Sequence, residues 1–375
     1  MMDLELSADF HDFLKEQKAN GKKIIAFMSH DNIPEELIDA GGFFPLNLIF
    51  AGNEQLMNAS HDYLPATTCS FAQSCIGLFS LKPRQFQFLE LIDYMIISNH
   101  CVSNICASEI ISKYFSIPRI NFYISYTQDE NASKYYKLEL LNFKKELEEI
   151  AGMKIENDEI FKSIQKYNTF KEKLSTLSTM NLNGRKKLEM IQKAILFGPS
   201  YLPEIEKFIE ENENKQEVNG KDLILTGCSI FIGDDLIDMI EESGGNIIFF
   251  DTWIGNNYYS QKFENGLLNK EKDPIDFLIE RFMRNKTGDH SVPFYLENKV
   301  AQLEKIYFDY KQKTGKNLAV INHIIKFCDH ISIMSAFLKN RLQQKGIFVL
   351  NLERDYSKSI RGQMTTRIEA FLEMI

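Results

Sequence analysis

The residues of this sequence best suited to chemistry are its cysteines, and their positions say more than their spacing. Neither the pair Cys69 and Cys75 nor the pair Cys101 and Cys106 has the Cys-x-x-Cys spacing typical of zinc or redox sites. Cys69, Cys101 and Cys328 each fall at the end of an expected strand or at the start of the next expected helix. Strand ends converge in α/β domains, so three thiolates could gather around one soft metal centre. The alternative for each is a small, semi-buried hydrophobic side chain.

Cys328 has the most informative surroundings. It lies just beyond the carboxyl end of the apolar run 318–325, which is of strand type. In an open parallel sheet, ligands bind at that edge. A second apolar run, 347–352, follows a helical stretch and ends in charged residues. We therefore expect Cys328 and the segment 353–367 to meet at one sheet edge. A helix N-terminus also lowers the pKa of a thiol, which favours the thiolate.

The elements that must position these residues alternate between strands and helices. Four apolar runs of strand type lie before residue 130, at 23–28, 44–50, 91–97 and 120–124. Four more follow Gly220, at 222–226, 247–250, 318–325 and 347–352. This alternation predicts βαβ units with parallel sheets. Between the two series the pattern is almost wholly helical, and the polar stretch 210–220 is the best linker candidate. We expect an α/β fold with one domain over 1–215, including a helical segment at about 130–215, and a second over 216–375.

Composition and charge exclude several classes of function. The 375 residues are 44% hydrophobic and 25% charged, as in ordinary globular proteins, and the formal net charge is −9. This charge argues against a surface for duplex nucleic acid or for an anionic membrane. The acidic N-terminus lacks an export signal pattern, and no apolar run approaches the length of a membrane span. We therefore expect a cytoplasmic protein without disulfides.

Other candidate residues are open to plain structural interpretations. Ser29, His30, Glu35 and Glu36 lie near the end of the first expected strand, and carboxylates at a helix start interact favourably with the helix dipole. The tripeptide 227–229 after a strand is typical of a tight turn. Phosphate-loop, dinucleotide and serine-hydrolase motifs are absent from the sequence.

Five segments together resemble the family of 2-hydroxyacyl-CoA dehydratase subunits, which includes subunits of benzoyl-CoA reductase and the double-cubane-cluster reductases. They are Ser-His-Asp-Asn-Ile-Pro-Glu-Glu-Leu-Ile-Asp-Ala-Gly at 29–41, Leu-Pro-Ala-Thr-Thr-Cys-Ser-Phe-Ala-Gln-Ser at 64–74, Leu-Ile-Leu-Thr-Gly at 223–227, Lys-Phe-Cys-Asp at 326–329, and the closing Arg-Gly-Gln-x-x-Thr-Arg-Ile-Glu-Ala-Phe at 361–371. Each segment is short, but their order and spacing along nearly the whole chain carry the resemblance.

The resemblance implies two flavodoxin-like α/β domains with a 4Fe-4S cluster between them. Its three cysteine ligands would be Cys69, Cys101 and Cys328. Relatives differ over the middle ligand, so Cys106 is the alternative to Cys101. We favour Cys101 because it directly follows a strand and begins a helix. In the double-cubane branch Cys228 would match a further ligand, but this chain has Trp253 where another cysteine is expected, so a single cluster fits better.

The family's chemistry implies the function and the partners. A 2-hydroxyacyl-CoA substrate accepts one low-potential electron at the thioester carbonyl, and the resulting ketyl radical expels the hydroxyl group. An ATP-hydrolysing iron–sulfur activator protein supplies the electron, and a second, homologous subunit forms the heterodimer with the first. The resemblance leaves open whether this chain is the catalytic or the relay subunit. By position, Ser29 and Glu36 are the candidate acid–base residues. Two alternatives are a reductase component of double-cubane or benzoyl-CoA type and a non-catalytic partner subunit derived from the family.

Overall fold

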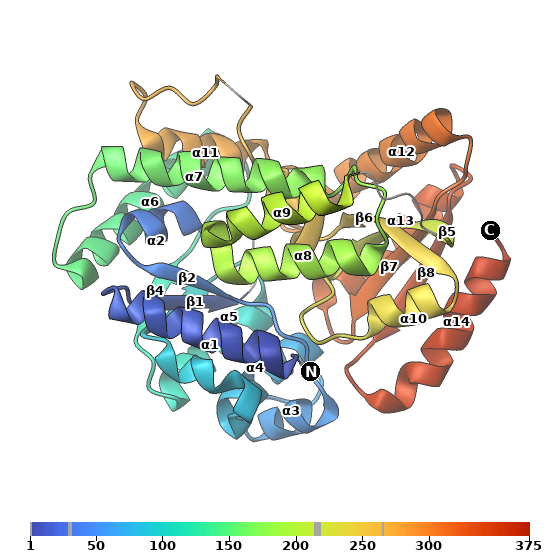
Figure 1. The fold of residues 1–375 in the computed structure, drawn as a ribbon, viewed down its shortest axis with the longest axis horizontal. Coiled ribbons are helices and arrows are strands. Elements are labelled where there is room, and N and C mark those ends of the chain that lie inside the picture. The colour runs from blue at the N-terminus through green and yellow to red at the C-terminus, as the bar shows by residue number, and fades with distance from the viewer. Residues whose placement is uncertain (1, 29–31, 214–218, 265) are drawn as a thin grey trace.

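Each half of the chain folds around a parallel sheet of four strands (Figure 1). The computed structural model describes residues 2–28, 32–213, 219–264 and 266–375. The N-terminal sheet has the order β2-β1-β3-β4, formed by β1 Ile24–Met28, β2 Phe44–Leu48, β3 Tyr94–Ser98 and β4 Arg119–Phe122. The C-terminal sheet has the corresponding order β6-β5-β7-β8, formed by β5 Lys221–Gly227, β6 Gly245–Asp251, β7 Ala319–Ile325 and β8 Phe348–Arg354. The α/β class and the doubly wound parallel sheets expected from the sequence are confirmed.

Helices cover both sheets and connect the two halves. The α-helices of the N-terminal half are α1 Leu4–Ala19, α2 Glu35–Ala40, α3 Glu54–Ala59, α4 Ser70–Leu81 and α5 Val102–Tyr114. The connecting helices are α6 Glu130–Ala151, α7 Asn157–Thr176, α8 Gly184–Phe197 and α9 Leu202–Asn212. Those of the C-terminal half are α10 Leu236–Glu242, α11 Pro274–Arg284, α12 Tyr295–Thr314, α13 Asp329–Gln343 and α14 Arg361–Glu373. Short helical turns span Ser60–Asp62, Arg84–Leu91, Gly198–Tyr201, Trp253–Asn257 and Lys358–Ile360.

The strands β1, β2 and β7 are buried on both faces, which explains their continuous apolar runs. Every residue of β1, β2 and β7 is buried, as expected for parallel strands covered by helices on both sides. Two strand boundaries differ from the sequence-based expectation. The run 91–97 forms a strand only from Tyr94, because Arg84–Leu91 forms a helical turn. The run 44–50 ends as a strand at Leu48, and the residues after it pair with the other half of the chain.

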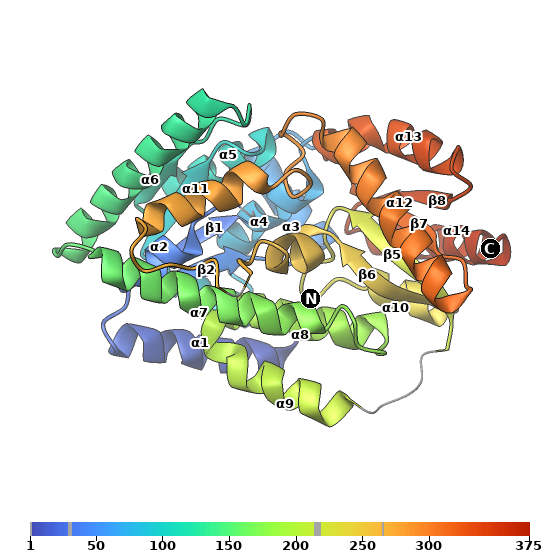
Figure 2. The same ribbon diagram turned by 90° about the horizontal axis from the view of Figure 1, so that it is seen from above.

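One hydrophobic core cluster contains residues of both sheets. Phe50 and Ile232 form an isolated parallel bridge between the halves, in which the N–H of Ile232 donates to the carbonyl of Ile49 at 2.9 Å. Next to this bridge the rings of Phe71 and Phe231 stack with their centroids 4.1 Å apart. In Figures 1 and 2, α7 lies over the N-terminal half and α8 lies between the two halves, where it contacts β2 as well as β6. The edges of the two sheets are thereby held against each other.

The helix α11 lies far from its sequence neighbours in the C-terminal sheet. Its residues Phe277 and Phe282 belong to a core cluster that also contains Phe27 of β1 and Phe143 of α6. A segment beyond residue 216 therefore packs on the N-terminal half, and the division at 215/216 stays a prediction. Within the residues that the structure describes, no helix combines the length and apolar character that crossing a bilayer would require.

Candidate functional site

Cys69, Cys101 and Cys328 each occupy the N-cap of a helix: α4, α5 and α13 respectively. Backbone N–H groups in the first turn of each helix act to lower the pKa of the thiol at its start. β3 ends shortly before Cys101 and β7 shortly before Cys328, so these two cysteines stand at the carboxyl edges of the two sheets. The helix starts thus provide the positive dipole ends and free N–H donors that favour a thiolate or a bound anionic group.

The structure brings these three cysteines together around one cavity of about 150 Å³ between the two halves. Among the described residues that line it is also a fourth cysteine, Cys228. Cys106, the alternative to Cys101, is exposed and is not one of those lining residues. Cys75 is buried inside α4. Of the two candidates for the middle ligand, the geometry therefore favours Cys101.

The thiols lie close to one another and are hard to ionise on their own. Cys328 is in side-chain hydrogen-bond contact with both Cys228 and Cys69. The hydrogen bond from Cys328 and burial raise the pKa of Cys69 well above its ordinary value, and burial raises the pKa of Cys101 to about 11. At neutral pH the thiols of Cys69 and Cys101 are therefore protonated unless a bound cation displaces their protons.

Cys228 follows the last residue of β5 and is fixed by a tight turn, as the sequence suggested. Gly227 has φ +87°, and a Cβ there would lie 2.4 Å from the carbonyl oxygen of His323 on β7. The N–H of Cys228 donates to the same carbonyl at 2.8 Å. The carbonyl of Cys228 is 2.9 Å from the Nδ1 of His323, and its sulfur accepts from the N–H of Ile325 at 3.4 Å. The sequence identified the turn, and the resemblance matched Cys228 to a further ligand only in the double-cubane branch. No local pattern indicated that this thiol lies beside Cys328.

Three histidines of the cavity wall were not identified from the sequence. The rings of His290 and His330 have their centroids 3.6 Å apart. Burial lowers the pKa of His290 to about 3 and that of His100 well below its ordinary value, so both are neutral. His100 Nε2 is 2.8 Å from the side-chain nitrogen of Asn104, and its Nδ1 is 2.8 Å from the hydroxyl of Ser98. The nearness of His100 and His330 to cysteines in the sequence was the only available signal.

Two buried donor or acceptor groups of the lining have no hydrogen-bond partner among the described residues. They are the indole N–H of Trp253 and the Nε2 of His290. A buried polar group without a partner costs free energy, and this cost is relieved when a ligand supplies the missing hydrogen bond. Trp253, which stands where the double-cubane branch would have a cysteine, is therefore a lining residue whose indole N–H has no partner among the described residues.

The described residues contain no group of three or more His, Cys, Asp or Glu side chains placed to hold a single metal ion. The ligands of a 4Fe-4S cluster surround a core of iron and sulfide, so they are spaced differently from the ligands of one ion. The donor set of the cavity, with cysteine sulfurs from both halves and a free indole N–H, fits the chemistry of such a cluster. Carboxylates, which suit harder ions, are not among the lining residues that the structure describes.

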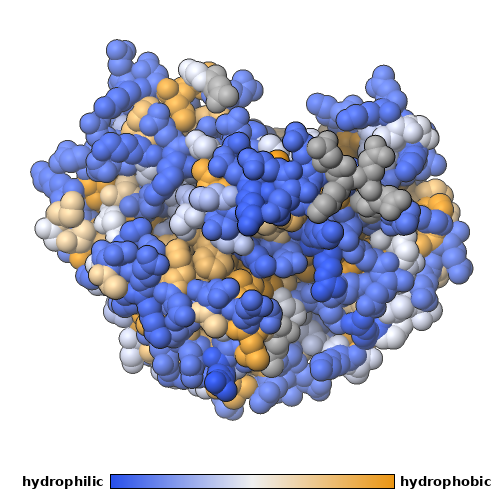
Figure 3. Space-filling view, in the orientation of Figure 1, coloured by the Kyte–Doolittle hydropathy of each residue, from blue (hydrophilic) through white to orange (hydrophobic). Residues whose placement is uncertain are grey.

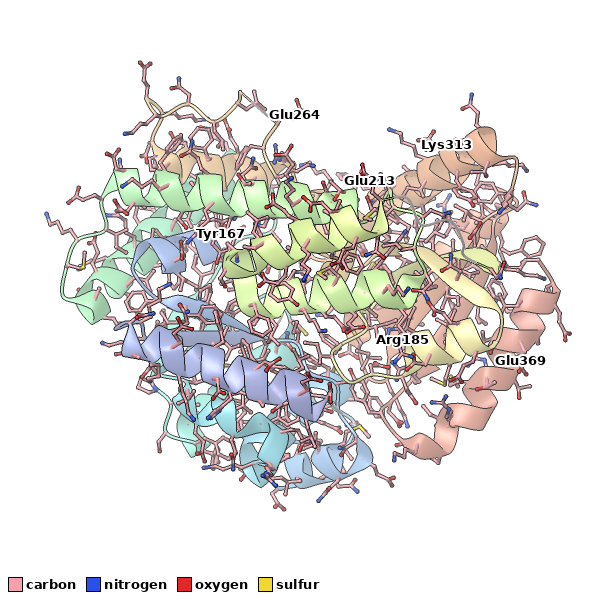
Figure 4. All side chains as sticks on the ribbon, viewed as in Figure 1. Tyr167, Arg185, Glu213, Glu264, Lys313 and Glu369 are labelled. Carbon is pink, nitrogen blue, oxygen red and sulfur yellow. The ribbon has the colours of Figure 1, made fainter. Side chains whose placement is uncertain are left out.

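Glu36 lies away from the cavity, in a buried ion-pair network. Only 1% of it is exposed. Arg281 of α11 binds both of its carboxylate oxygens, one of them at 2.8 Å, and Lys171 of α7 lies 3.4 Å away. Burial alone would raise the pKa of Glu36, but the charges of Arg281 and Lys171 outweigh it and hold this pKa well below its ordinary value. Tyr167, labelled in Figure 4, lies on α7 within cation–π distance of the same lysine.

Glu35, which precedes Glu36, is linked through Tyr258 to the lining residue Trp253. Its carboxylate accepts a hydrogen bond of 2.9 Å from the hydroxyl of Tyr258, whose ring packs edge-on against that of Trp253. Burial raises the pKa of Glu35 to about 7, although Lys171 acts in the opposite direction. Ser29 lies outside the described residues. The catalytic roles expected for Ser29 and Glu36 stay predictions.

Two doubly wound parallel sheets whose strand ends meet at a cysteine-lined cavity define this molecule as an α/β protein with a thiol site between its halves. The chain belongs to the 2-hydroxyglutaryl-CoA dehydratase, D-component, family, whose model matches residues 32–375.

Named relatives agree with this assignment. The chain is 24% identical to the (R)-phenyllactyl-CoA dehydratase beta subunit of Clostridium sporogenes, over 96% of this chain and 94% of that protein. It is 21% identical to the beta subunit of lactoyl-CoA dehydratase from Anaerotignum propionicum, over 91% and 89% of the two chains. It is also 26% identical to one of the benzoyl-CoA reductase subunits of Thauera aromatica, over 39% of this chain and 37% of that one.

Proposed function

We propose that this chain is the iron–sulfur subunit of a 2-hydroxyacyl-CoA dehydratase. The observation that carries the proposal is the convergence of Cys69, Cys101 and Cys328 on one cavity. These residues are far apart in the sequence, and they come from three helix starts in two halves of the molecule. Burial as small core side chains would not require these cysteines to line the same cavity. Two relatives that match nearly the whole chain are named as dehydratase beta subunits.

The residues of the cavity have distinct tasks in this proposal. A 4Fe-4S cluster, when bound, would supply a one-electron redox centre. The three thiolates would hold it, and the N–H groups of the helix starts would stabilise its negative charge. The free indole N–H of Trp253 would donate to a cluster sulfur, which raises the reduction potential. Apolar residues of the wall, such as Phe231, would limit the access of water.

A second, homologous subunit is the partner that we infer. Four large apolar side chains are exposed on helices that also carry cavity residues, or at the start of such a helix: Val102 at 70%, Phe294 at 75%, Ile333 at 70% and Phe337 at 60%. Val102 directly follows Cys101, and Phe294 directly precedes the lining residue Tyr295. Exposed apolar residues mark a protein contact where they form one contiguous patch, so these four residues are the surface that we assign to the partner. The face shown in Figure 3 is mainly hydrophilic, with hydrophobic residues at several places.

The substrate and the electron donor belong to the same proposal. The names of the two beta-subunit relatives refer to CoA thioesters of 2-hydroxy acids, so an acyl-CoA of this class is the expected substrate. The expected electron donor is an ATP-hydrolysing iron–sulfur activator. A reductase component is the second candidate, supported by the partial match to a benzoyl-CoA reductase subunit.

Matched alanine variants of the two cysteines on α5 test the proposal. We expect Cys101→Ala to lose iron and activator-dependent turnover of 2-hydroxyacyl-CoA esters, because it removes a thiol from the cavity. Cys106→Ala should keep both, because its side chain is exposed. Iron content, circular dichroism and turnover are measured without oxygen, with the second subunit present. Loss of iron in Cys106→Ala but not in Cys101→Ala would transfer the ligand role to Cys106. Bound iron without dehydration in the wild type would favour the reductase candidate.

A further inference from the structure

The cavity contains one more thiol than the cluster of the proposed function requires. Cys228 reaches the cavity from the carboxyl end of β5, next to the strand that leads to Cys328. Its side chain is in hydrogen-bond contact with that of Cys328, which also contacts Cys69. Four cysteines, two from each half of the molecule, therefore line the same space.

Hydrogen bonds fix both the backbone and the sulfur of Cys228. Both its backbone N–H and its backbone carbonyl are hydrogen-bonded to His323, at 2.8 and 2.9 Å. His323 is fully buried in the middle of the C-terminal sheet. The N–H of Ile325 points at the sulfur itself, at 3.4 Å. Hydrogen bonds from backbone N–H groups to sulfur are the kind that stabilise a cysteine thiolate bound to iron.

We propose that Cys228 is the fourth protein ligand of the cluster, so that every iron is bound by a cysteine of this chain. The inference rests on the proposed function and deepens it. A metal centre that binds substrate keeps an open coordination position, whereas a closed centre does not. A 4Fe-4S cluster with four cysteine ligands is the arrangement of electron-transfer proteins. This subunit then passes electrons to its partner, and the 2-hydroxyacyl-CoA oxygen binds elsewhere in the complex.

Controlled oxidation distinguishes a closed cluster from an open one. An iron that lacks a cysteine ligand is released readily, according to [4Fe-4S]²⁺ → [3Fe-4S]⁺ + Fe²⁺ + e⁻, and ferricyanide accepts the electron to give ferrocyanide. The three-iron product has its own electron paramagnetic resonance signal. We expect the wild-type full-length protein, prepared without oxygen and with its second subunit, to form little of this product with stoichiometric ferricyanide.

The Cys228→Ala variant should form several-fold more three-iron cluster than the wild type under the same conditions. Cys106→Ala is the control, because it removes an exposed thiol that is not part of the described lining, and it should behave as the wild type does. Equal amounts of three-iron product in the wild type and in Cys228→Ala would overturn the inference.

A measurement on the wild type keeps the test decisive if Cys228→Ala does not fold. The Mössbauer spectrum of its oxidised cluster should lack a distinct iron site of higher isomer shift, because all four irons have sulfur ligands. A distinct site would overturn the inference while leaving the proposed function intact. Absence of iron and acid-labile sulfide from the wild type would instead refute the proposed function. The two failures are therefore distinguishable.

Discussion

At the scale of single residues, two neighbouring glutamates show that burial and nearby charges can shift the pKa of similar side chains in opposite directions. Glu35 and Glu36 both open α2. The sequence pattern favoured helix-start electrostatics for both, and Glu36 was also a candidate acid–base residue by position. In the structure Glu36 is ionised between Arg281 and Lys171, whereas Glu35 is bound by a tyrosine hydroxyl and has a pKa of about 7. Tertiary contacts, rather than the helix dipole, therefore decide the protonation of both.

Glu35→Gln should remove a pH dependence of stability. Since burial raises the pKa of Glu35 from 4.5 to about 7 in the folded state, the folded protein binds more protons than the unfolded chain between these values. Its contribution to stability is therefore complete below pH 4.5 and is lost as the pH rises through 7. Glutamine keeps an acceptor for the hydroxyl of Tyr258 and does not ionise.

We expect the free energy of unfolding of Glu35→Gln to exceed that of the wild type by about 1–3 kcal/mol at pH 8, and by less than about 1 kcal/mol at pH 5. Urea denaturation at the two pH values measures both differences. A difference that does not change with pH would show that Glu35 titrates in the folded protein as it does in the unfolded chain.

At the scale of elements, the sequence predicted where the cysteines stand but not all of their neighbours. Apolar runs followed by capping positions located Cys101 and Cys328 at the junctions of strands and helices, because burial on both faces gives parallel strands a recognisable pattern. The position of Cys228 beside Cys328 depends on the pairing of β5 with β7. These strands are separated by most of the C-terminal half, and no local pattern records which strands become neighbours.

The turn that ends β5 depends on glycine. Gly227→Ala should lower the free energy of unfolding by about 3 kcal/mol or more, because alanine is strained at φ +87° and its Cβ would lie 2.4 Å from a backbone carbonyl oxygen. Gly244→Ala is the control: it has φ +91°, but a Cβ there meets nothing within 4 Å, so a loss of only about 1–2 kcal/mol is expected. Thermal or urea unfolding measures both variants. Equal losses of unfolding free energy in the two variants would show that the close approach of residue 227 to β7 does not add to the cost of the Cβ.

At the scale of the whole molecule, contacts between distant parts of the chain set the arrangement of the two halves. The eight expected strands occur in the structure, and their parallel pairing follows from the alternation of strands and helices. The return of α11 to the N-terminal half could not be predicted, because its amphipathic pattern shows only that one face is buried. The ion pair between Glu36 and Arg281 joins residues 245 positions apart in the sequence.

Arg281→Met should destabilise the folded chain by about 3 kcal/mol, because it leaves Glu36 buried with only Lys171 to compensate its charge. Arg119→Met is the matched control: its ion pair with Glu109 is about half exposed on both sides, so a change below about 1 kcal/mol is expected. Urea denaturation at pH 7 measures both variants. Similar small changes in both would show that the buried network does not hold α11 in place.

The central claim is that the cavity between the two halves holds one iron–sulfur cluster. The most direct test is to measure iron and acid-labile sulfide in the wild-type chain, purified without oxygen, beside the Cys328→Ala variant. We expect about four irons and four sulfides per wild-type chain, and loss of most of both in the variant. Wild-type protein without iron and sulfide, or a Cys328→Ala variant that retains the full complement of both, would contradict it.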